Sequence, residues 1–349
     1  MPQSDDPFVS LLIPIRNEAR YIERCLQAVL AQDYPPERME VLVIDGMSAD
    51  GTREKVQALI ESRKGTAPEI VLLDNAPGIV PTGLNIGLRR ARGEIIVRVD
   101  GHCVIAPNYV SACVAHIKNL GVDGVGGPME SIGETSTAQL IATVMSSPFG
   151  VGNSFFRTVT GKTMLVDTVP FPAYTREIIR KAGLYDEELV RDQDDEYNYR
   201  IRALGGRVLL ADDVRSRYFS RASLKSLWRQ YFQYVYWKVR VLQKHPLQMR
   251  PRQFVPPLFV LALIFSLILA FIPGVRWLAL VVPGLYLLAN LTASLITAAK
   301  KGWRLSPLLP LAFAILHLSY GLGFLTGLVR FARRWKDRTG KTPLWTEGG

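Results

Sequence analysis

Cysteine is scarce in this sequence. The three residues, Cys25, Cys103 and Cys113, have no metal-ligand spacing and cannot all pair with one another. This excludes a disulfide-stapled secreted scaffold and indicates reduced thiols facing the cytosol. The first residues contain neither a basic segment nor an apolar run, so we expect no signal peptide. Hydrophobic residues make up 48% of the chain and charged residues 21%, which excludes wholesale disorder.

Acidic residues are missing from 223–252, where basic and aromatic side chains are interleaved. The chain has a net charge of +11, and its basic residues gather late, beside long apolar runs. A basic aromatic segment of this kind is typical of helices that lie in the membrane interface. RNA binding is the rival interpretation, but the apolar segments that follow favour an anionic membrane surface. We therefore expect no nucleic-acid partner.

Long apolar runs are confined to the C-terminal part. Three blocks, Phe254 to Ile272, Trp277 to Ala299 and about Pro307 to Val329, each have about the 20 residues that a crossing needs. With the N-terminal domain cytoplasmic, three crossings place the tail outside, whereas its basic residues mark it as cytoplasmic. A re-entrant or interfacial first block is the alternative. We expect a multi-pass protein of the cell inner (plasma) membrane, with the topology open.

Short apolar runs alternate with helical patterns in the first part of the chain. This rhythm predicts right-handed βαβ units and a parallel sheet in an α/β domain. The predicted strands are Phe8–Ile15, Val41–Ile44, Ile70–Leu73 and Glu94–Val99. The predicted helices are Ala19–Ala31, a helix capped by Ser48 or Asp50 that runs to about Arg63, and Pro81–Arg90. We expect four segments: a domain over 1–222, interfacial helices over 223–252, transmembrane helices over 253–330 and a basic tail over 331–349.

Three predicted strands end in polar groups, at Arg16 to Glu18, at Asp45, and at Asp100 with His102. The carboxyl ends of parallel strands meet at one edge of a sheet, where ligands bind. A carboxylate such as Asp45 can accept hydrogen bonds from a base or ribose, and Asp100 with His102 can hold a divalent cation beside a phosphate. Each of these polar segments, taken alone, more often forms an ordinary turn. Together they predict a nucleotide cleft.

A second polar cluster, Asp194, Asp195 and Glu196, begins a predicted helix. An acidic first turn is favoured by the helix dipole, which is the simpler interpretation. The alternative is catalytic: a carboxylate here can take a proton from an attacking hydroxyl, which is worth on the order of 10² to 10⁴ in rate.

Four motifs carry a specific resemblance: Pro14-Ile-Arg-Asn-Glu18, Ile44–Thr52, Pro81–Gly87 and Val99-Asp-Gly-His102. They resemble the family 2 glycosyltransferases of the GT-A fold, and most of all the branch that builds bacterial exopolysaccharides such as succinoglycan. The resemblance implies a Rossmann-like nucleotide-diphospho-sugar transferase domain followed by α-helical transmembrane segments. It also implies inverting transfer from a nucleotide-diphosphate sugar to a lipid-linked saccharide, for exopolysaccharide or cell-surface glycan synthesis.

Two other functions stay open. One is transfer of the sugar to a polyprenyl phosphate itself. The other is a non-catalytic nucleotide-binding membrane scaffold, since His102 stands where the family most often has a second Asp, and Gln193 where it has Glu. Donor sugar, linkage, processivity and oligomeric state are not predicted.

The resemblance assigns roles to individual residues. Asp100 and His102 match the site for Mg²⁺ or Mn²⁺ and the diphosphate, and Asp194 matches the catalytic base, with Asp195 as the alternative. The implied donor contacts are Pro14, Arg16, Asn17, Glu18, Asp45, Asp50, Asn85, Arg98 and Asp100.

Acceptor contacts are implied by a further motif. Gln230-Tyr-Phe-Gln-Tyr234 resembles the Gln-x-x-Arg-Trp motif, and Gln233 to Trp237 is a second register; neither keeps the Arg. The candidates are Gln230, Gln233, Tyr234 and Trp237. Two segments rich in Gly and Pro, Ser146–Gly152 and Thr168–Tyr174, resemble acceptor-lining loops, and we expect no regular structure in them.

Overall fold

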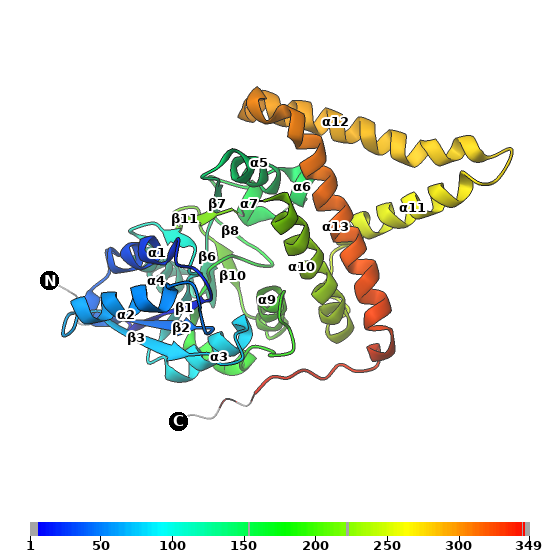
Figure 1. The fold of residues 1–349 in the computed structure, drawn as a ribbon. Coiled ribbons are helices and arrows are strands. Elements are labelled where there is room, and N and C mark those ends of the chain that lie inside the picture. The colour runs from blue at the N-terminus through cyan, green and yellow to red at the C-terminus, as the bar shows by residue number, and fades with distance from the viewer. Residues whose placement is uncertain (1–5, 153, 221–222, 344, 346–349) are drawn as a thin grey trace. The chain divides into compact units, whose positions relative to one another are not determined.

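The computed structural model describes residues 6–152, 154–220, 223–343 and 345, and the chain divides into two compact units (Figure 1). The first unit contains residues 1–130, 159–218 and 340–349, and the second contains 131–158 and 219–339. Residues 131–158, which the sequence-based division places in the α/β domain, therefore pack with the C-terminal helices.

The first unit is built on an eight-stranded sheet in the order β3-β2-β1-β4-β9-β6-β10-β8, with a smaller sheet in the order β5-β11-β7. The strands are β1 (Val9–Ile15), β2 (Met39–Asp45), β3 (Glu69–Asp74), β4 (Ile95–Arg98), β5 (Cys103–Ile105), β6 (Gly124–Gly126), β7 (Met129–Ile132), β8 (Met164–Leu165), β9 (Ala173–Thr175), β10 (Val208–Leu210) and β11 (Ser216–Phe219). Its α-helices are α1 (Ile22–Leu30), α2 (Thr52–Ser62), α3 (Val80–Arg90), α4 (Tyr109–Leu120), α8 (Arg176–Ala182) and α9 (Gln193–Ala203).

The first four strands are parallel, as the sequence predicts. Every residue of β2 and β4 is buried, which explains why these strands are continuous apolar runs rather than alternating ones. β1 includes Pro14, close to its end. β4 pairs with β1 only as far as Leu12, so at Pro14 only β2 still pairs with this strand.

The sheet is not parallel throughout. β9 runs antiparallel between β4 and β6, and β8 runs antiparallel to β10. The predicted parallel βαβ arrangement thus holds for β1 to β4 and does not extend to the later strands. The expectation of irregular structure over Thr168–Tyr174 holds as far as Pro172 and is wrong for the last two residues, where β9 begins. Pro148–Val151 likewise forms a single helical turn. Elements of three or four residues are too short to show a recognisable period.

The second unit consists of α5 (Ser136–Met145), α6 (Pro148–Val151), α7 (Phe155–Thr158), α10 (Leu224–Lys244), α11 (Val255–Leu269), α12 (Val281–Lys301) and α13 (Leu309–Arg330). α10 and α13 run side by side (Figure 1). A Cβ atom on Gly323 would lie 2.4 Å from Phe232 O, and one on Gly327 would lie 2.8 Å from Tyr236 O. These two glycines, four residues apart, let the backbones of α10 and α13 approach closely.

Three basic side chains of α10 are buried: Lys238, Arg240 and Lys244. Arg240 donates to the carbonyl oxygens of Asp337 at 2.6 Å and Thr339 at 3.0 Å. The sequence analysis treats the basic residues of 223–252 together as groups for anionic lipid. These three face the protein interior instead, and so do not reach lipid headgroups.

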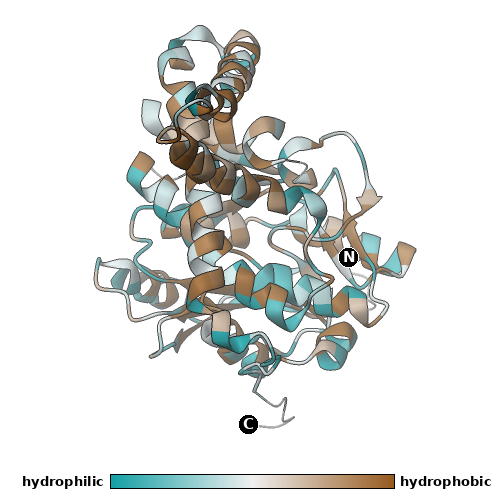
Figure 2. Cartoon of the chain, turned by 90° about the vertical axis from the view of Figure 1, so that its right-hand side faces the viewer, coloured by the Kyte–Doolittle hydropathy of each residue, from teal (hydrophilic) through white to brown (hydrophobic). Residues whose placement is uncertain are grey.

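Three helical segments are long and apolar enough to cross a membrane: Pro251–Leu269, Arg276–Lys301 and Trp303–Arg330. They coincide with the three apolar blocks of the sequence. Figure 2 shows the hydrophobic colouring concentrated on these helices, whereas colours alternate along the elements of the α/β unit. The prediction of an α/β domain followed by apolar helices that can span a membrane is confirmed.

Candidate active site

Arg98, the last residue of β4, lies between two carboxylates. Its Nε is 2.9 Å from Asp100 Oδ1 and its Nη2 is 3.3 Å from Asp100 Oδ2. On its other side, Nη1 lies 3.9 Å from Oδ2 of Asp194, in the first turn of α9. The structure therefore brings together the end of β4 and the start of α9, which are far apart in the sequence.

The Arg98 side chain is buried. Burial disfavours its charge, but the carboxylates of Asp100 and Asp194 outweigh that effect and raise the pKa of Arg98 above its ordinary value. Arg98 is thus a permanent cation that offsets the repulsion between two acidic groups. Asp194 remains half exposed, at 50% of its side chain, so it can still meet a substrate.

α9 is fixed firmly behind Asp194. The Tyr197 ring stacks on Tyr185 with centroids 4.0 Å apart. Asn198 accepts a hydrogen bond from the Tyr174 hydroxyl at 2.8 Å and donates to the Asp194 carbonyl oxygen at 2.9 Å. β9, which the sequence analysis missed, supplies Tyr174 and so helps to position this helix.

The two neighbours of Asp194 in the sequence, Gln193 and Asp195, make different contacts from those of Asp194. Gln193 is buried, and its Oε1 has no hydrogen-bond partner among the residues that the structure describes. The backbone N–H of Asp195 donates to Asp194 Oδ1 at 3.0 Å. Of the two candidate bases, Asp194 is therefore the one placed beside Arg98 and Asp100.

His102 is held by Glu18: the two groups lie 2.8 Å apart, from Nδ1 to Oε1. The Tyr218 ring packs edge-on at 4.8 Å from the imidazole. A carboxylate and an imidazole are suitable donors for Mn²⁺ or Mg²⁺. Within the described part of the chain, however, no three His, Cys, Asp or Glu side chains gather as a metal site. The residues present thus fit a cation that also takes oxygens from a bound diphosphate.

Two loops at this edge of the sheet form one hydrogen-bonded framework. Asn17 N donates to Ser48 Oγ at 2.9 Å, and Ala49 N donates to Asn17 Oδ1 at 2.9 Å. Glu18 N donates to Thr52 Oγ1 at 2.8 Å. We call this framework, residues 16–19 with 45–52, the paired loops.

Asp50 joins the same framework. It accepts from Ala19 N at 3.1 Å and from Thr52 N at 3.1 Å. Partial burial acts against ionisation, but hydrogen bonds from Thr52 and Ala19 prevail and lower the pKa of Asp50. Asp50 thus connects the paired loops to the start of α2.

Asp45 has no exposed surface. Its carboxylate accepts from Ser48 Oγ at 2.6 Å and from Arg53 Nη1 at 3.2 Å. Arg53 also pairs with Asp74 at 2.7 Å. The sequence analysis missed Arg53, although a signal was there: Asp45 and Asp74 end neighbouring strands in register, and two adjacent carboxylates require a cation.

The other predicted donor contacts occupy different positions. Arg16 donates to the Gly78 carbonyl oxygen at 2.8 Å, next to the paired loops. Asn85 is buried and its amide is used within the unit, donating to the Tyr185 carbonyl oxygen at 2.9 Å and accepting from Tyr185 N at 2.8 Å. Asn85 thus holds the segment that precedes α9. Pro14 lies inside β1.

The predicted acceptor residues lie on α10, in the second unit. Gln230 is buried, and its Nε2 donates to the Tyr234 hydroxyl at 3.1 Å, while its Oε1 has no partner among the described residues. Trp237 packs at 5.8 Å from the Phe331 ring. The structure therefore gives Gln230 and Tyr234 a shared polar contact and Trp237 an apolar packing role; Gln233 lies between them on α10.

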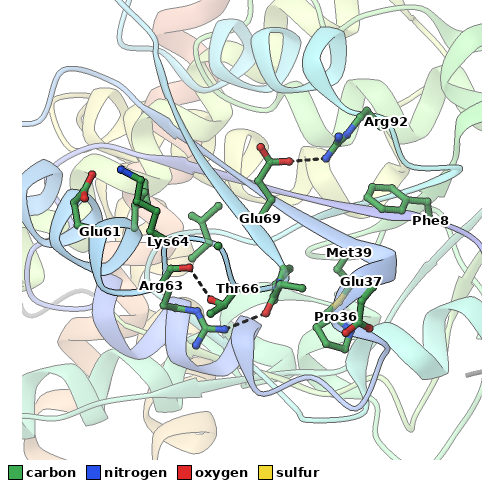
Figure 3. Close-up of a pocket in the computed structure, with 15 residues that line it drawn as sticks. Phe8, Pro36, Glu37, Met39, Glu61, Arg63, Lys64, Thr66, Glu69 and Arg92 are labelled. Atoms are coloured by element: carbon green, nitrogen blue, oxygen red, sulfur yellow. Dashed lines mark hydrogen bonds and ion pairs between the residues drawn. The ribbon is translucent and has the colours of Figure 1, made fainter. Parts of the chain in front are cut away.

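A separate pocket lies at the other end of the strands (Figure 3). Met39 and Glu69, the first residues of β2 and β3, line it, together with an ion pair between Arg92 and Glu69. Asp45 and Asp74 are the last residues of the same strands. This pocket is thus distinct from the edge that carries the candidate active site.

Fold and site together define the class: an α/β sheet whose strand ends present acidic groups, in the GT-A arrangement of nucleotide-diphospho-sugar transferases. The model of "Glycosyl transferase family 2" matches residues 10–184. The chain belongs to glycosyltransferase family 2, as the sequence motifs predicted.

Two curated relatives are similar over nearly their whole length. "Succinoglycan biosynthesis protein ExoA" of Rhizobium meliloti is 29% identical over 93% of this chain and 96% of its own. A "dolichyl N-acetyl-alpha-D-glucosaminyl phosphate 3-beta-D-2,3-diacetamido-2,3-dideoxy-beta-D-glucuronosyltransferase" of Methanococcus voltae is 25% identical over 93% of this chain and 98% of its own.

Among solved structures, the mannosyltransferase PcManGT from Pyrobaculum calidifontis, in complex with GDP-Man and Mn²⁺, has the same fold. Its TM-score is 0.58 at 20% sequence identity, over 93% of this chain and 89% of that one. The similarity extends beyond the region matched by the family model, and it supports the GT-A fold.

Proposed function

We propose that this protein is an inverting glycosyltransferase that moves a sugar from a nucleotide-diphosphate sugar to a lipid-linked saccharide, with Asp194 as the general base. The observation that carries the proposal is the position of Arg98 between Asp100 and Asp194. The carboxylates of Asp100 and Asp194 thus belong to one site, which supports a displacement at a sugar bound between them.

The donor half of the site is the paired loops with Arg53, Asp100 and His102. In this proposal the paired loops and Asp45 hold the nucleoside. Asp100 and His102 hold Mg²⁺ or Mn²⁺, which supplies charge neutralisation for the diphosphate. Glu18 orients the His102 ring, since its carboxylate lies 2.8 Å from Nδ1.

The acceptor half uses Asp194 to remove the proton from the attacking hydroxyl. Arg98 holds this carboxylate in place, since its Nη1 lies 3.9 Å from Asp194 Oδ2. Inversion follows from a single displacement with the base on the face opposite the leaving diphosphate.

A lipid-linked acceptor is supported by two observations. Three apolar helical segments can cross a membrane. The name of the Methanococcus voltae relative describes a dolichyl-linked sugar phosphate as its substrate. A membrane-attached enzyme meets such an acceptor at a high local concentration. In this proposal the α/β unit is cytoplasmic and the protein belongs to the inner membrane.

The test is a transfer assay with purified full-length protein in detergent. A panel of UDP- and GDP-sugars is supplied with Mn²⁺ and with polyprenyl-diphosphate saccharides or polyprenyl phosphate. We expect product only with a saccharide acceptor. If product formed on polyprenyl phosphate alone, the acceptor would be polyprenyl phosphate and not a lipid-linked saccharide. Donor binding without any transfer or hydrolysis would favour the scaffold function.

A further inference from the structure

The C-terminal tail is part of the first unit. Lys341 N donates to Asp186 Oδ1 at 2.7 Å, and Lys341 O accepts from Glu187 N at 2.9 Å. A Cβ atom on Gly340 would lie 2.5 Å from Asp186 Oδ2, so the tail packs tightly here. Asp186 and Glu187 precede α9, which carries Asp194. The tail is therefore bonded to the α/β unit that contains the candidate active site.

This contact fixes on which side of a membrane α13 ends. α13 ends at Arg330, and Gly340 already lies in the first unit. The connecting residues include Arg333, Arg334, Lys336, Asp337 and Arg338, and charged residues of this density do not cross a hydrocarbon core. The end of α13 is therefore on the same side as the α/β unit, so α11, α12 and α13 together cross an even number of times.

α13 differs from the other two apolar helices in its exposure. The apolar windows of α11 and α12 are 17% and 11% buried, whereas that of α13 is 44% buried. α11 and α12 expose large side chains such as Phe265, Leu267, Leu285 and Leu288. All residues of α13 are described, and its exposed large hydrophobic residues are Leu311 and Val329.

α13 is covered mainly by α10, which pairs with it along the glycine seam of Gly323 and Gly327. The start of α11 adds a shorter contact, where Gly321 of α13 meets Pro256 and Val260. Basic residues recur along the whole of α10, from Lys225 and Arg229 to Lys244, so α10 does not enter hydrocarbon. Because α13 runs beside α10, we infer that α13 lies at the same depth as α10, in the interfacial layer of the membrane.

The basic residues around α11 and α12 are distributed as expected for a membrane hairpin formed by these two helices. Basic residues stand at both ends of the α11–α12 pair: Arg250 and Arg252 before α11, and Lys300, Lys301 and Arg304 after α12. The turn between them carries only Arg276, and no acidic residue occurs from 214 to 336. Such an asymmetry favours a hairpin whose open end faces the anionic cytoplasmic leaflet.

We propose that α11 and α12 form the bilayer-embedded surface of this protein, a hairpin that enters and returns through one face, while α13, the tail and the α/β unit all stay on that face. The partner of this surface is a lipid bilayer with anionic headgroups. The inference rests on the membrane attachment in the proposed function and not on the transfer reaction.

Single-cysteine labelling of the full-length protein tests it, because the three native cysteines are buried. Burial, together with the nearby Asp100 carboxylate, raises the pKa of Cys25 to about 12, which further lowers background reaction. Ser62→Cys reports the α/β unit and Thr342→Cys reports the tail. A membrane-impermeant maleimide is applied to right-side-out and inside-out vesicles.

We expect Thr342→Cys and Ser62→Cys to react in the same vesicle orientation and to be protected in the other. Reaction of Thr342→Cys only in the opposite orientation would overturn the proposal, since α13 would then cross. Leu267→Cys, 64% exposed in the protein, is expected to react only after detergent is added. Its reaction in intact vesicles of either orientation would show that the hairpin is not embedded.

A second variant tests the docked tail. Gly340→Val places a methyl group against Asp186, whose Oδ1 already accepts from Lys341 N and Glu188 N. We expect the labelling rate of Thr342→Cys to rise several-fold in this background with the sidedness unchanged. An unchanged rate would contradict the contact on which the inference depends. Transfer activity, assayed on the same vesicles, is a separate readout, so a protein inactive as a transferase still reports its topology.

Discussion

Arg98 Nη1 lies 3.9 Å from Oδ2 of Asp194, and the same guanidinium forms two hydrogen bonds with Asp100. Arg98→Met would leave the two carboxylates facing one another without a cation, and breaking a buried charge pair costs about 3–5 kcal/mol. We expect lower thermal stability and at least tenfold slower transfer. Arg98→Lys should recover stability but not turnover, because Lys cannot hold Asp100 through two donors. Wild-type turnover in Arg98→Met would remove Arg98 from the site.

Asp194 and its neighbour form a matched pair for assigning the base. Asp194→Asn should slow transfer by about 10²- to 10⁴-fold, because the amide cannot accept the hydroxyl proton. Donor binding, measured by calorimetry, should stay within a few-fold of the wild type. Asp195→Asn is the control, since Asp195 is not the group beside Arg98. The opposite ranking of the two variants would transfer the role to Asp195.

Arg53 joins the ends of two strands through Asp45 and Asp74. The charge-assisted hydrogen bond to the buried Asp45 contributes about 1.5–3 kcal/mol, whereas the pair with the exposed Asp74 contributes little. Arg53→Gln should therefore loosen the paired loops and weaken binding of UDP- or GDP-sugars about tenfold or more. Lys55→Gln on the same helix is the control, because its ion pair with Glu23 is exposed and contributes little. Equal effects of both changes on donor affinity would contradict this role for Arg53.

Glu18 holds the His102 ring at 2.8 Å. Groups that orient a metal-ligating imidazole typically contribute 10- to 100-fold in metal affinity. We expect Glu18→Gln to raise the Mn²⁺ concentration needed for half-maximal transfer by about that factor. Binding of Mn²⁺ with nucleoside diphosphate, followed by electron paramagnetic resonance, should weaken in parallel. The exposed carboxylate of Glu23 provides the control through Glu23→Gln, which should change neither quantity.

The glycine seam gives a prediction about stability. Gly323→Val places a methyl group near 2.4 Å from Phe232 O and should separate α10 from α13. Overpacking of this kind costs about 1–3 kcal/mol, which lowers the melting temperature in detergent. Gly284→Val on α12 is the matched control, since nothing lies within 4 Å of its added Cβ. If the glycine seam did not contribute to stability, the two variants would have the same melting temperature.

Local patterns in the sequence were enough to predict the strands that carry the site. β1, β2 and β4 are almost wholly buried, so their apolar runs are continuous, and Asp45 and Asp100 lie where two of these runs stop. The resemblance of the motifs to a known family then gave the fold and family correctly. That Asp194 belongs to the site was an expectation of that resemblance only, and its contact with Arg98 was not predicted because it joins distant segments.

Other features depend on partners that no local pattern reveals. β9 is three residues long and is ordered by its neighbours β4 and β6. The burial of Lys238 and Arg240 depends on how α10 packs, and composition alone treats them as surface charge. The docking of Gly340 and Lys341 on the segment before α9 likewise involves a pairing across much of the chain.

The hydrogen bonds that link Asn17, Glu18 and Ala19 to Ser48, Asp50 and Thr52 are made entirely between groups of the protein. An arriving nucleotide therefore meets a surface that is ordered beforehand, and little of the binding free energy is consumed in freezing the backbone. Changes in loop mobility with temperature should therefore have little effect on the affinity for the nucleoside part of the donor. In the proposed function, discrimination among donors that share a nucleotide then depends on residues outside the paired loops, where the sugar binds.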